Sequence, residues 1–172
     1  MATGRGRSNQ LTKQVGEYLV ACELARRGLI VATFSGNVPD FDLIATDGKG
    51  ASCPIQVKTM RGGSWQFSTD KFADITFKGK RQVVGRKKPL PVPQLICVFV
   101  LASEKYGQDK FFVLKWSRVR DIVVANHKSW LKKHGGIRPK KFDSMHCSIY
   151  EKDLRRYMDD WGLIKKSFKR RM

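Results

Sequence analysis

Two short apolar segments that carry polar side chains place the strongest limit on what this chain can fold into. Residues 41–46 read Phe-Asp-Leu-Ile-Ala-Thr and residues 55–59 read Ile-Gln-Val-Lys-Thr, and both are typical of β-strands. Asp42 lies in the first segment, and Gln56 and Lys58 lie in the second. Since burying an unpaired charge is costly, a chain that places such residues on strands usually gives them partners or a function.

The alternation of side chains along a strand groups these three residues. Gln56 and Lys58 are two positions apart, so they point to the same face of their strand. Asp47-Gly48, between the two segments, is typical of a hairpin turn. If the strands pair through this turn, Asp42 can lie across from the face that carries Gln56 and Lys58, and the geometry permits one cluster.

A helix predicted over residues 11–27 supplies a fourth candidate. Glu17 is followed by apolar Val20 and Ala21 at the third and fourth positions, where side chains on one helical face meet. Glu23, in contrast, is followed by two arginines at the same spacing, which is the pattern of a solvated surface pair. The pattern therefore favours Glu17 as the glutamate that faces the site.

The rest of the chain predicts an α/β domain over residues 10–164, between a flexible basic arm at 1–9 and a basic tail at 165–172. A turn is expected at 35–39, and the strands before residue 70 are expected to form a meander. Ser117 is the expected N-cap of the second helix. The remaining predicted elements are strands at 29–34, 65–69, 94–102, 110–115 and 145–150, a basic loop at 78–91, and helices at 117–133 and 153–160.

The charge of the chain limits its partners. The 172 residues include 34 lysines and arginines and 15 acidic residues, so the net charge is +19. A domain with this excess favours a polyanion, and nucleic acid is the first candidate, before an anionic membrane surface or a ribosomal structural role. The expected contacts with nucleic acid are Lys13, Arg61, Lys78, Lys80, Arg81, Arg86, Lys87 and Lys88.

Other classes of protein are disfavoured. The four cysteines are scattered without a Cys-x-x-Cys motif, which argues against a zinc ribbon or a secreted disulfide framework. The longest apolar run, residues 95–102, is too short to cross a bilayer. The expectation is a cytoplasmic, nucleoid-associated protein that has no membrane partner and no small-molecule cofactor.

The candidate cluster has the chemistry of a divalent-metal site. Asp42 and Gln56 offer hard oxygen ligands, which suit Mg²⁺ or Mn²⁺. Lys58 is placed to orient a water molecule and to stabilise developing charge, and Glu17 to hold a metal-bound water or a second ion. Together these groups can hydrolyse a phosphodiester.

The same residues carry a resemblance to a known superfamily. Residues 42–45 (Asp-Leu-Ile-Ala) and 55–59, preceded by a helix with Gly16-Glu17, resemble the PD-(D/E)XK nucleases. Within that superfamily, they resemble the Holliday-junction-resolvase-like members and the homing endonucleases that carry Q-x-K. Residues 150–164 are similar to the end of small proteins of this kind.

The resemblance implies a restriction-endonuclease-like α/β core, with a central mixed β-sheet flanked by helices. It also implies a Mg²⁺- or Mn²⁺-dependent endodeoxyribonuclease, either junction-resolving or site-specific, that acts on double-stranded or branched DNA as a homodimer. By position, Asp42, Gln56 and Glu17 would bind metal, and Lys58 would serve the nucleophile.

One departure from the family pattern leaves an alternative open. The position of Gln56 usually holds an acid, and a neutral amide is a weaker ligand than a carboxylate. The alternative is a catalytically inactive DNA-binding protein that retains the nuclease fold. Asp40, which follows Pro39 directly, is the second choice for the aspartate of the motif.

Overall fold

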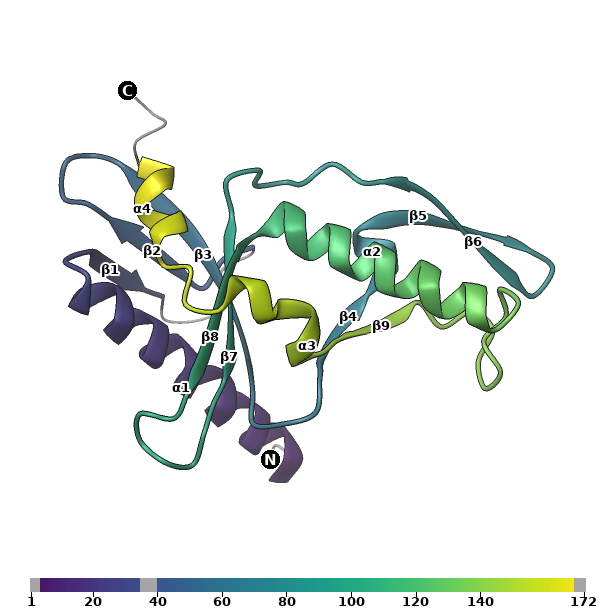
Figure 1. The fold of residues 1–172 in the computed structure, drawn as a ribbon, viewed down its shortest axis with the longest axis horizontal. Coiled ribbons are helices and arrows are strands. Elements are labelled where there is room, and N and C mark those ends of the chain that lie inside the picture. The colour runs from purple at the N-terminus through teal and green to yellow at the C-terminus, as the bar shows by residue number, and fades with distance from the viewer. Residues whose placement is uncertain (1–3, 35–39, 169–172) are drawn as a thin grey trace.

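A five-stranded mixed sheet forms the centre of the protein (Figure 1). The computed structural model describes residues 4–34 and 40–168. The strand order is β1-β2-β3-β7-β8, in which β3 and β7 run parallel and the other neighbours run antiparallel. The strands are β1 (Ile30–Thr33), β2 (Leu43–Thr46), β3 (Ser52–Met60), β7 (Ile96–Leu101) and β8 (Lys110–Lys115). The expected central mixed sheet flanked by helices is confirmed.

Helices cover both faces of this sheet. On one face, α1 (Gly4–Arg26) and α4 (Gly162–Phe168) bury their apolar residues against β2, β3 and β7. On the other face, α2 (Trp116–Lys133) and α3 (Glu151–Leu154) pack with β4 (Trp65–Ser68) and β9 (His146–Ile149). The sheet is therefore the middle of three layers, and β7 is buried on both sides because its run of residues is apolar throughout.

Two small sheets lie outside the central one. β4 pairs with β9, and β5 (Ala73–Lys78) pairs with β6 (Arg81–Lys87). The expected meander is therefore confirmed for β1 to β3 and wrong for β4, which leaves the central sheet. The expected basic loop at 78–91 is wrong over most of its length, because charged residues on the exposed face of β5 and β6 conceal the period of two. Short 3₁₀ turns occupy Thr69–Lys71 and Arg155–Tyr157.

The helices depart from the sequence predictions at their ends. α1 begins at Gly4, so residues 4–9 are helical rather than a flexible arm, since a formed helix gains one hydrogen bond for each residue added. α2 begins at Trp116, and Ser117 is not its N-cap. The helix expected at 153–160 is the shorter α3 with the 3₁₀ turn after it.

The C-terminal boundary also moves. Residues 165–168 belong to α4 instead of a basic tail, because Trp161, Ile164 and Phe168 are buried at helical spacing and lysines lie between them. The turn expected at 35–39 and residues 1–3 and 169–172 lie outside the described residues.

Two smaller predictions concern cysteines and membranes. The four cysteines are free, without a disulfide, and Cys53, Cys97 and Cys147 are buried whereas Cys22 is exposed. No helix within 4–34 and 40–168 is long and apolar enough to cross a membrane.

Candidate functional site

A groove forms where the central sheet leaves one edge of β3 open. β2 pairs with β3 only as far as Ile55, whereas β7 follows β3 from Ile55 to Met60. From Gln56 onward, β3 therefore has a sheet neighbour on one side only. The groove beside this edge has a volume of about 450 Å³ and is lined by Ser8, Asn9, Thr12 and Lys13 of α1, by Val57, Lys58, Thr59 and Met60 of β3, and by Arg61 and Gly62.

Helix α1 reaches this edge because it carries a glycine at the point of contact. A Cβ atom on Gly16 would lie 1.7 Å from Thr59 Oγ1, so no other residue fits there without displacing the helix. The next residue is Glu17, whose carboxylate binds Lys13, a residue that lines the groove. In the Gly16-Glu17 pair, the glycine therefore permits the contact of α1 with Thr59, and the glutamate binds Lys13.

Asp42 is fixed by β3 just before β2 begins. Its backbone N–H donates to Ile55 O at 2.8 Å, and its Oδ2 accepts a hydrogen bond from the backbone N–H of Val57, also at 2.8 Å. Gln56 Nε2 donates to the same carboxylate oxygen. The Asp42 side chain is only 9% exposed, so its position is set by the backbone. The structure thus brings Asp42 and Gln56 together.

Lys13 joins Glu17 to Asp42. Its Nζ lies 3.4 Å from Glu17 Oε1 and 3.3 Å from Asp42 Oδ1. Burial lowers the pKa of Lys13, but attraction to Asp42 and Glu17 outweighs it, so the pKa is raised. The two carboxylates therefore share one cation, which offsets their mutual repulsion. Lys13 was expected to contact nucleic acid, and sequence reasoning missed this bridging position.

Lys58 differs from Lys13 because its charge has no partner. Within the described part of the chain, its ammonium forms no ion pair and no hydrogen bond, although its side chain is half-buried in the wall of the groove. Its backbone is held in place, since Trp65 Nε1 donates to Lys58 O at 2.9 Å. Lys58 and Asp42 both act electrostatically on the buried Cys97 thiol, whose pKa burial raises well above its usual range. Asp42 accepts a hydrogen bond from the N–H of Val57, so its carboxylate lies against the residue that directly precedes Lys58.

The side chains joined by Lys13 and Asp42 include oxygen donors of the kind that a divalent cation such as Mg²⁺ takes. No group of three or more His, Cys, Asp or Glu suited to a metal occurs among residues 4–34 and 40–168. The donor set is instead two carboxylates, Glu17 and Asp42, with the amide of Gln56 beside them. Mg²⁺ commonly takes one or two carboxylates and keeps waters or substrate phosphate as its other ligands. A half-turn of the Gln56 amide presents its oxygen in place of its nitrogen.

Asp40 lies apart from the groove. It has a φ of 72°, in the left-handed region that residues other than glycine rarely adopt. It lines a small cavity of about 60 Å³ that Gln56, Leu95 and Trp116 also border. Asp42, not Asp40, is therefore the aspartate that binds Lys13, which also binds Glu17.

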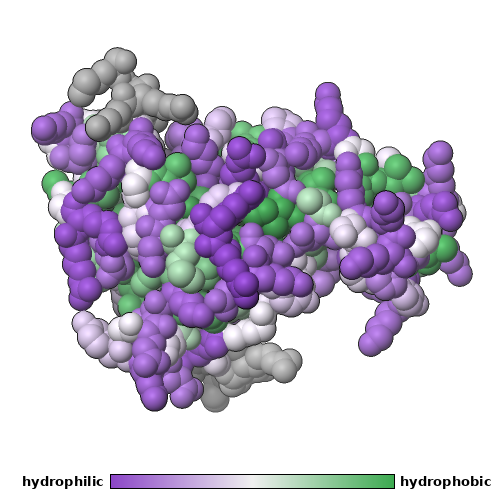
Figure 2. Space-filling view, viewed as in Figure 1, coloured by the Kyte–Doolittle hydropathy of each residue, from purple (hydrophilic) through white to green (hydrophobic). Residues whose placement is uncertain are grey.

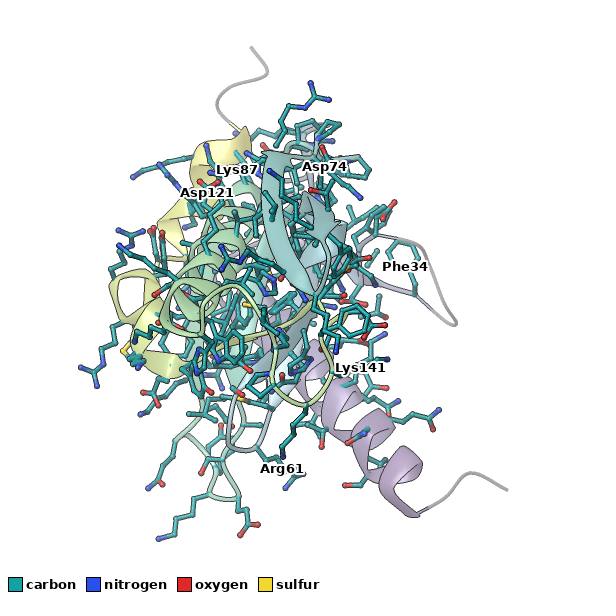
Figure 3. The ribbon with its side chains drawn as sticks, turned by 90° about the vertical axis from the view of Figure 1, so that its right-hand side faces the viewer. Phe34, Arg61, Asp74, Lys87, Asp121 and Lys141 are labelled. Carbon is teal, nitrogen blue, oxygen red and sulfur yellow. The ribbon has the colours of Figure 1, made fainter. Side chains whose placement is uncertain are left out.

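The other basic residues expected to bind nucleic acid fall into two places. Arg61 follows β3 at the end of the groove, and Figure 3 places it at the opposite end of the view from Lys87 and Asp121. Lys78, Arg81, Arg86 and Lys87 lie on β5 and β6, with Lys80 in the turn between them and Lys88 directly after β6. All six are exposed, and Lys87 forms an ion pair with Asp121 at 2.7 Å.

Comparison with known structures identifies a similar fold. The chain is similar to the bacterial homing endonuclease I-Ssp6803I, with a TM-score of 0.51 and 15% sequence identity over 95% of this chain and 97% of that one. The fold is nuclease-like. Neither a scan of family models nor a search of curated protein sequences finds a match. At this level of identity the similarity concerns the fold alone.

Proposed function

We propose that the protein is a metal-dependent DNA endonuclease whose site is formed by Glu17, Asp42, Gln56 and Lys58. The observation that carries the proposal is Lys58, which is half-buried in the wall of an open groove, forms no ion pair within the described residues, and directly follows Val57, whose N–H holds the Asp42 carboxylate. A structural lysine usually extends its charge to solvent or to a carboxylate. A half-buried lysine that has no carboxylate partner among the described residues and lines an open groove is suited to a substrate anion.

Each residue has a part in phosphodiester hydrolysis. Lys13, Lys58 and Arg61 line the groove and attract the phosphate, and Lys58 stabilises the negative charge that develops when water attacks phosphorus and the P–O bond breaks. Glu17, Asp42 and Gln56 would hold Mg²⁺ or Mn²⁺, which neutralises phosphate oxygens and lowers the pKa of a bound water.

The backbone provides the precision that these roles need. The N–H of Val57 and the contact of Gly16 with Thr59 hold Asp42 and Glu17 on rigid elements, so little reorganisation is required when the substrate arrives. The charge of +19 supports nucleic acid as the substrate, and the expected DNA-bound location is the nucleoid in the cytoplasm. Cutting two strands or a junction requires two sites, so the acting form is a homodimer on double-stranded or branched DNA.

Cleavage assays on supercoiled and branched DNA test the proposal. The unmodified protein is expected to cut in Mg²⁺ or Mn²⁺, and Asp42→Ala and Lys58→Ala are expected to lose cleavage while they retain the fold by circular dichroism. Glu104→Ala and Lys165→Ala remove matched charges from exposed positions away from the groove and should cut normally. Cleavage that survives both groove substitutions would refute the site.

The hydrogen bonds of Asp42 favour a second candidate, a DNA-binding protein that does not cut. The Gln56 amide and Lys13 already satisfy the carboxylate without a metal ion. This candidate predicts salt-sensitive DNA binding without cleavage in any divalent metal. Gln56→Glu would then supply the missing charge, and new cleavage by this variant alone would favour the second candidate over the first.

A further inference from the structure

The β5–β6 ribbon is a two-stranded sheet that is separate from the central one. Lys78 and Arg81 pair across a two-residue turn, Gly79-Lys80, in which Gly79 has a φ of 58°. The ribbon projects at the end of the molecule far from β1, as Figure 1 shows. Hydrophilic residues are prominent at this end of the molecular surface (Figure 2). A strand pair outside the central sheet needs contacts of its own to stabilise it, and its exposed residues call for a functional explanation.

The inner face of the ribbon provides the support through buried polar contacts. Gln82 is 4% exposed, and its Nε2 donates to the carbonyl oxygens of Phe142 at 2.6 Å and Ser144 at 2.9 Å. Its Oε1 lies 2.9 Å from Nε2 of His127, which is fully buried in α2. The rings of Phe77 and Phe142 also meet edge to face on this side. These contacts tie the ribbon to α2 and to the segment before β9, so the ribbon is a rigid platform.

A glycine in the turn after α2 completes this support. Gly136 O accepts a hydrogen bond from the backbone N–H of Gln82 at 2.9 Å. A Cβ atom on Gly136 would lie 2.6 Å from Arg81 Cγ, so the stem of Arg81 rests against this glycine. The position of Arg81 is thus limited at its base while its side chain remains exposed.

The outer face carries a mixed set of exposed side chains, of which only the stem of Arg81 takes part in the support of the ribbon. Thr76 and Val83 pair directly across the two strands, and Lys78 and Arg81 pair next to them at the tip. All four residues are exposed, and neither cation forms an ion pair within the described residues. Asp74 lies further from the tip on the exposed side. A surface that bound phosphates alone would need cations only, whereas this one places a hydroxyl and a methyl pair between cations and an acid.

We infer that the β5–β6 ribbon reads base sequence by entering the major groove of duplex DNA with the face that carries Thr76, Lys78, Arg81 and Val83. The major groove admits a two-stranded ribbon, and each base pair presents a distinct pattern of donors, acceptors and methyl groups there. Arginine and lysine pair with guanine, and threonine and valine methyl groups contact the thymine methyl. The inference rests on DNA as the ligand of the proposed function, and it adds the residues that determine specificity.

Selection from a library of duplexes with randomised sequence tests the inference. The selection is by binding and is done without divalent metal ions, so that the DNA is not cut. The result is therefore separate from the test of endonuclease activity. The unmodified protein is expected to enrich a preferred sequence. Thr76→Ala and Val83→Ala are expected to lose about 5- to 100-fold discrimination at one or two base pairs, which is the range for single base contacts. Because both substitutions are uncharged, the salt dependence of binding should not change.

Two further variants separate base reading from phosphate contact. Arg81→Met should relax the preference at one position and also reduce the slope of affinity against salt by about one. Lys165→Met, on the exposed side of α4, removes the same charge and should leave the preferred sequence unchanged. An unchanged preference in Thr76→Ala, Val83→Ala and Arg81→Met overturns the inference alone. A protein that binds every sequence equally also overturns it, and a protein that binds no DNA overturns the proposed function with it.

Discussion

The groove at the open edge of β3 and the β5–β6 ribbon are both basic, but they hold their charges in opposite ways. In the groove, Lys13 bridges two half-buried or buried carboxylates, and the backbone fixes Asp42. On the ribbon, the cations of Lys78 and Arg81 are exposed and have no acidic partner within the described residues. Side chains that packing and the backbone hold in place suit a reaction that needs one geometry, whereas exposed side chains on a firm base suit contact with the edges of base pairs.

The groove and the ribbon are also stabilised by different kinds of contact. The groove depends on close packing, since Gly16 lets α1 touch Thr59 directly. The ribbon depends on a buried polar network of Gln82, His127 and Arg138, in which Arg138 Nη2 lies 3.1 Å from His127 Nδ1. Changes in the groove should therefore alter the rate of a bound complex, and changes on the ribbon should alter which DNA is bound.

Replacement of Lys58 is expected to have the largest effect. Lys58→Met should reduce single-turnover cleavage at saturating protein by about 100- to 1,000-fold or more, because an electrostatic stabiliser of the reacting phosphate is lost. Arg81→Met should leave the saturated rate on the preferred sequence near that of the unmodified protein. A normal saturated rate in Lys58→Met, or a collapse of the saturated rate in Arg81→Met, would reverse the roles of the two regions.

Gly16→Ala is expected to have the next largest effect, and it tests the packing of α1 against β3 beside the groove. The added methyl group meets Thr59 Oγ1, so the free energy of unfolding should fall by about 1–3 kcal/mol, as for other overpacked sites. Chemical denaturation measures this loss. Gly62→Ala is the matched control in the same groove, since a Cβ there meets nothing within 4 Å. Thr59→Ala should partly rescue Gly16→Ala, and a double variant that is no more stable than Gly16→Ala would contradict the packing argument.

Sequence reasoning predicted the parts of the fold whose signals are local. β3 includes the expected segment 55–59, because its side chains alternate between apolar and polar, and β8 has the expected extent, because lysines bound a short apolar run. Asp42 and Gln56 were expected to meet because one hairpin connects them, and they do. The ribbon was missed because Gln82, a polar residue, occupies the buried position where an apolar one would have marked a strand.

Other parts of the site depend on contacts between distant segments. The position of Lys13 between two carboxylates follows from the angle at which α1 crosses β3, and that angle is set by Gly16 and Thr59, 43 positions apart in the sequence. No periodicity encodes such a contact. The departure of β4 to pair with β9 is of the same kind, since its partner lies at the other end of the chain.

Acidification should weaken the support of the ribbon. Burial, with the positive charge of Arg138, lowers the pKa of His127 from 6.5 to about 4. Between these values the unfolded chain binds a proton that the folded chain does not, so stability falls as the pH drops from about 6.5 to about 4. The loss is at most about 1.4 kcal/mol for each pH unit.

Denaturation curves across this pH range measure the effect. His127→Gln keeps a hydrogen-bonding side chain but cannot titrate, so its stability should depend less on pH than that of the unmodified protein. His134→Gln, which changes an exposed histidine, should leave the dependence intact. Equal slopes for all three proteins would show that His127 does not govern the acid response.

The Lys87–Asp121 ion pair is expected to contribute least to stability. It distinguishes Lys87, which has an acidic partner, from Lys78, which has none within the described residues. Its partners lie 2.7 Å apart and are both partly exposed, so the coupling should be about 0.2–1 kcal/mol. A double-mutant cycle of Lys87→Met and Asp121→Asn measures this coupling, which high salt should reduce.

Lys78→Met should change stability by less than about 0.5 kcal/mol, as surface substitutions usually do, and yet weaken DNA binding more than Lys87→Met. If Lys87→Met weakened DNA binding as much as Lys78→Met does, the ion pair would not hold Lys87 away from DNA, and the ribbon would be a uniform cationic surface instead of a reading face.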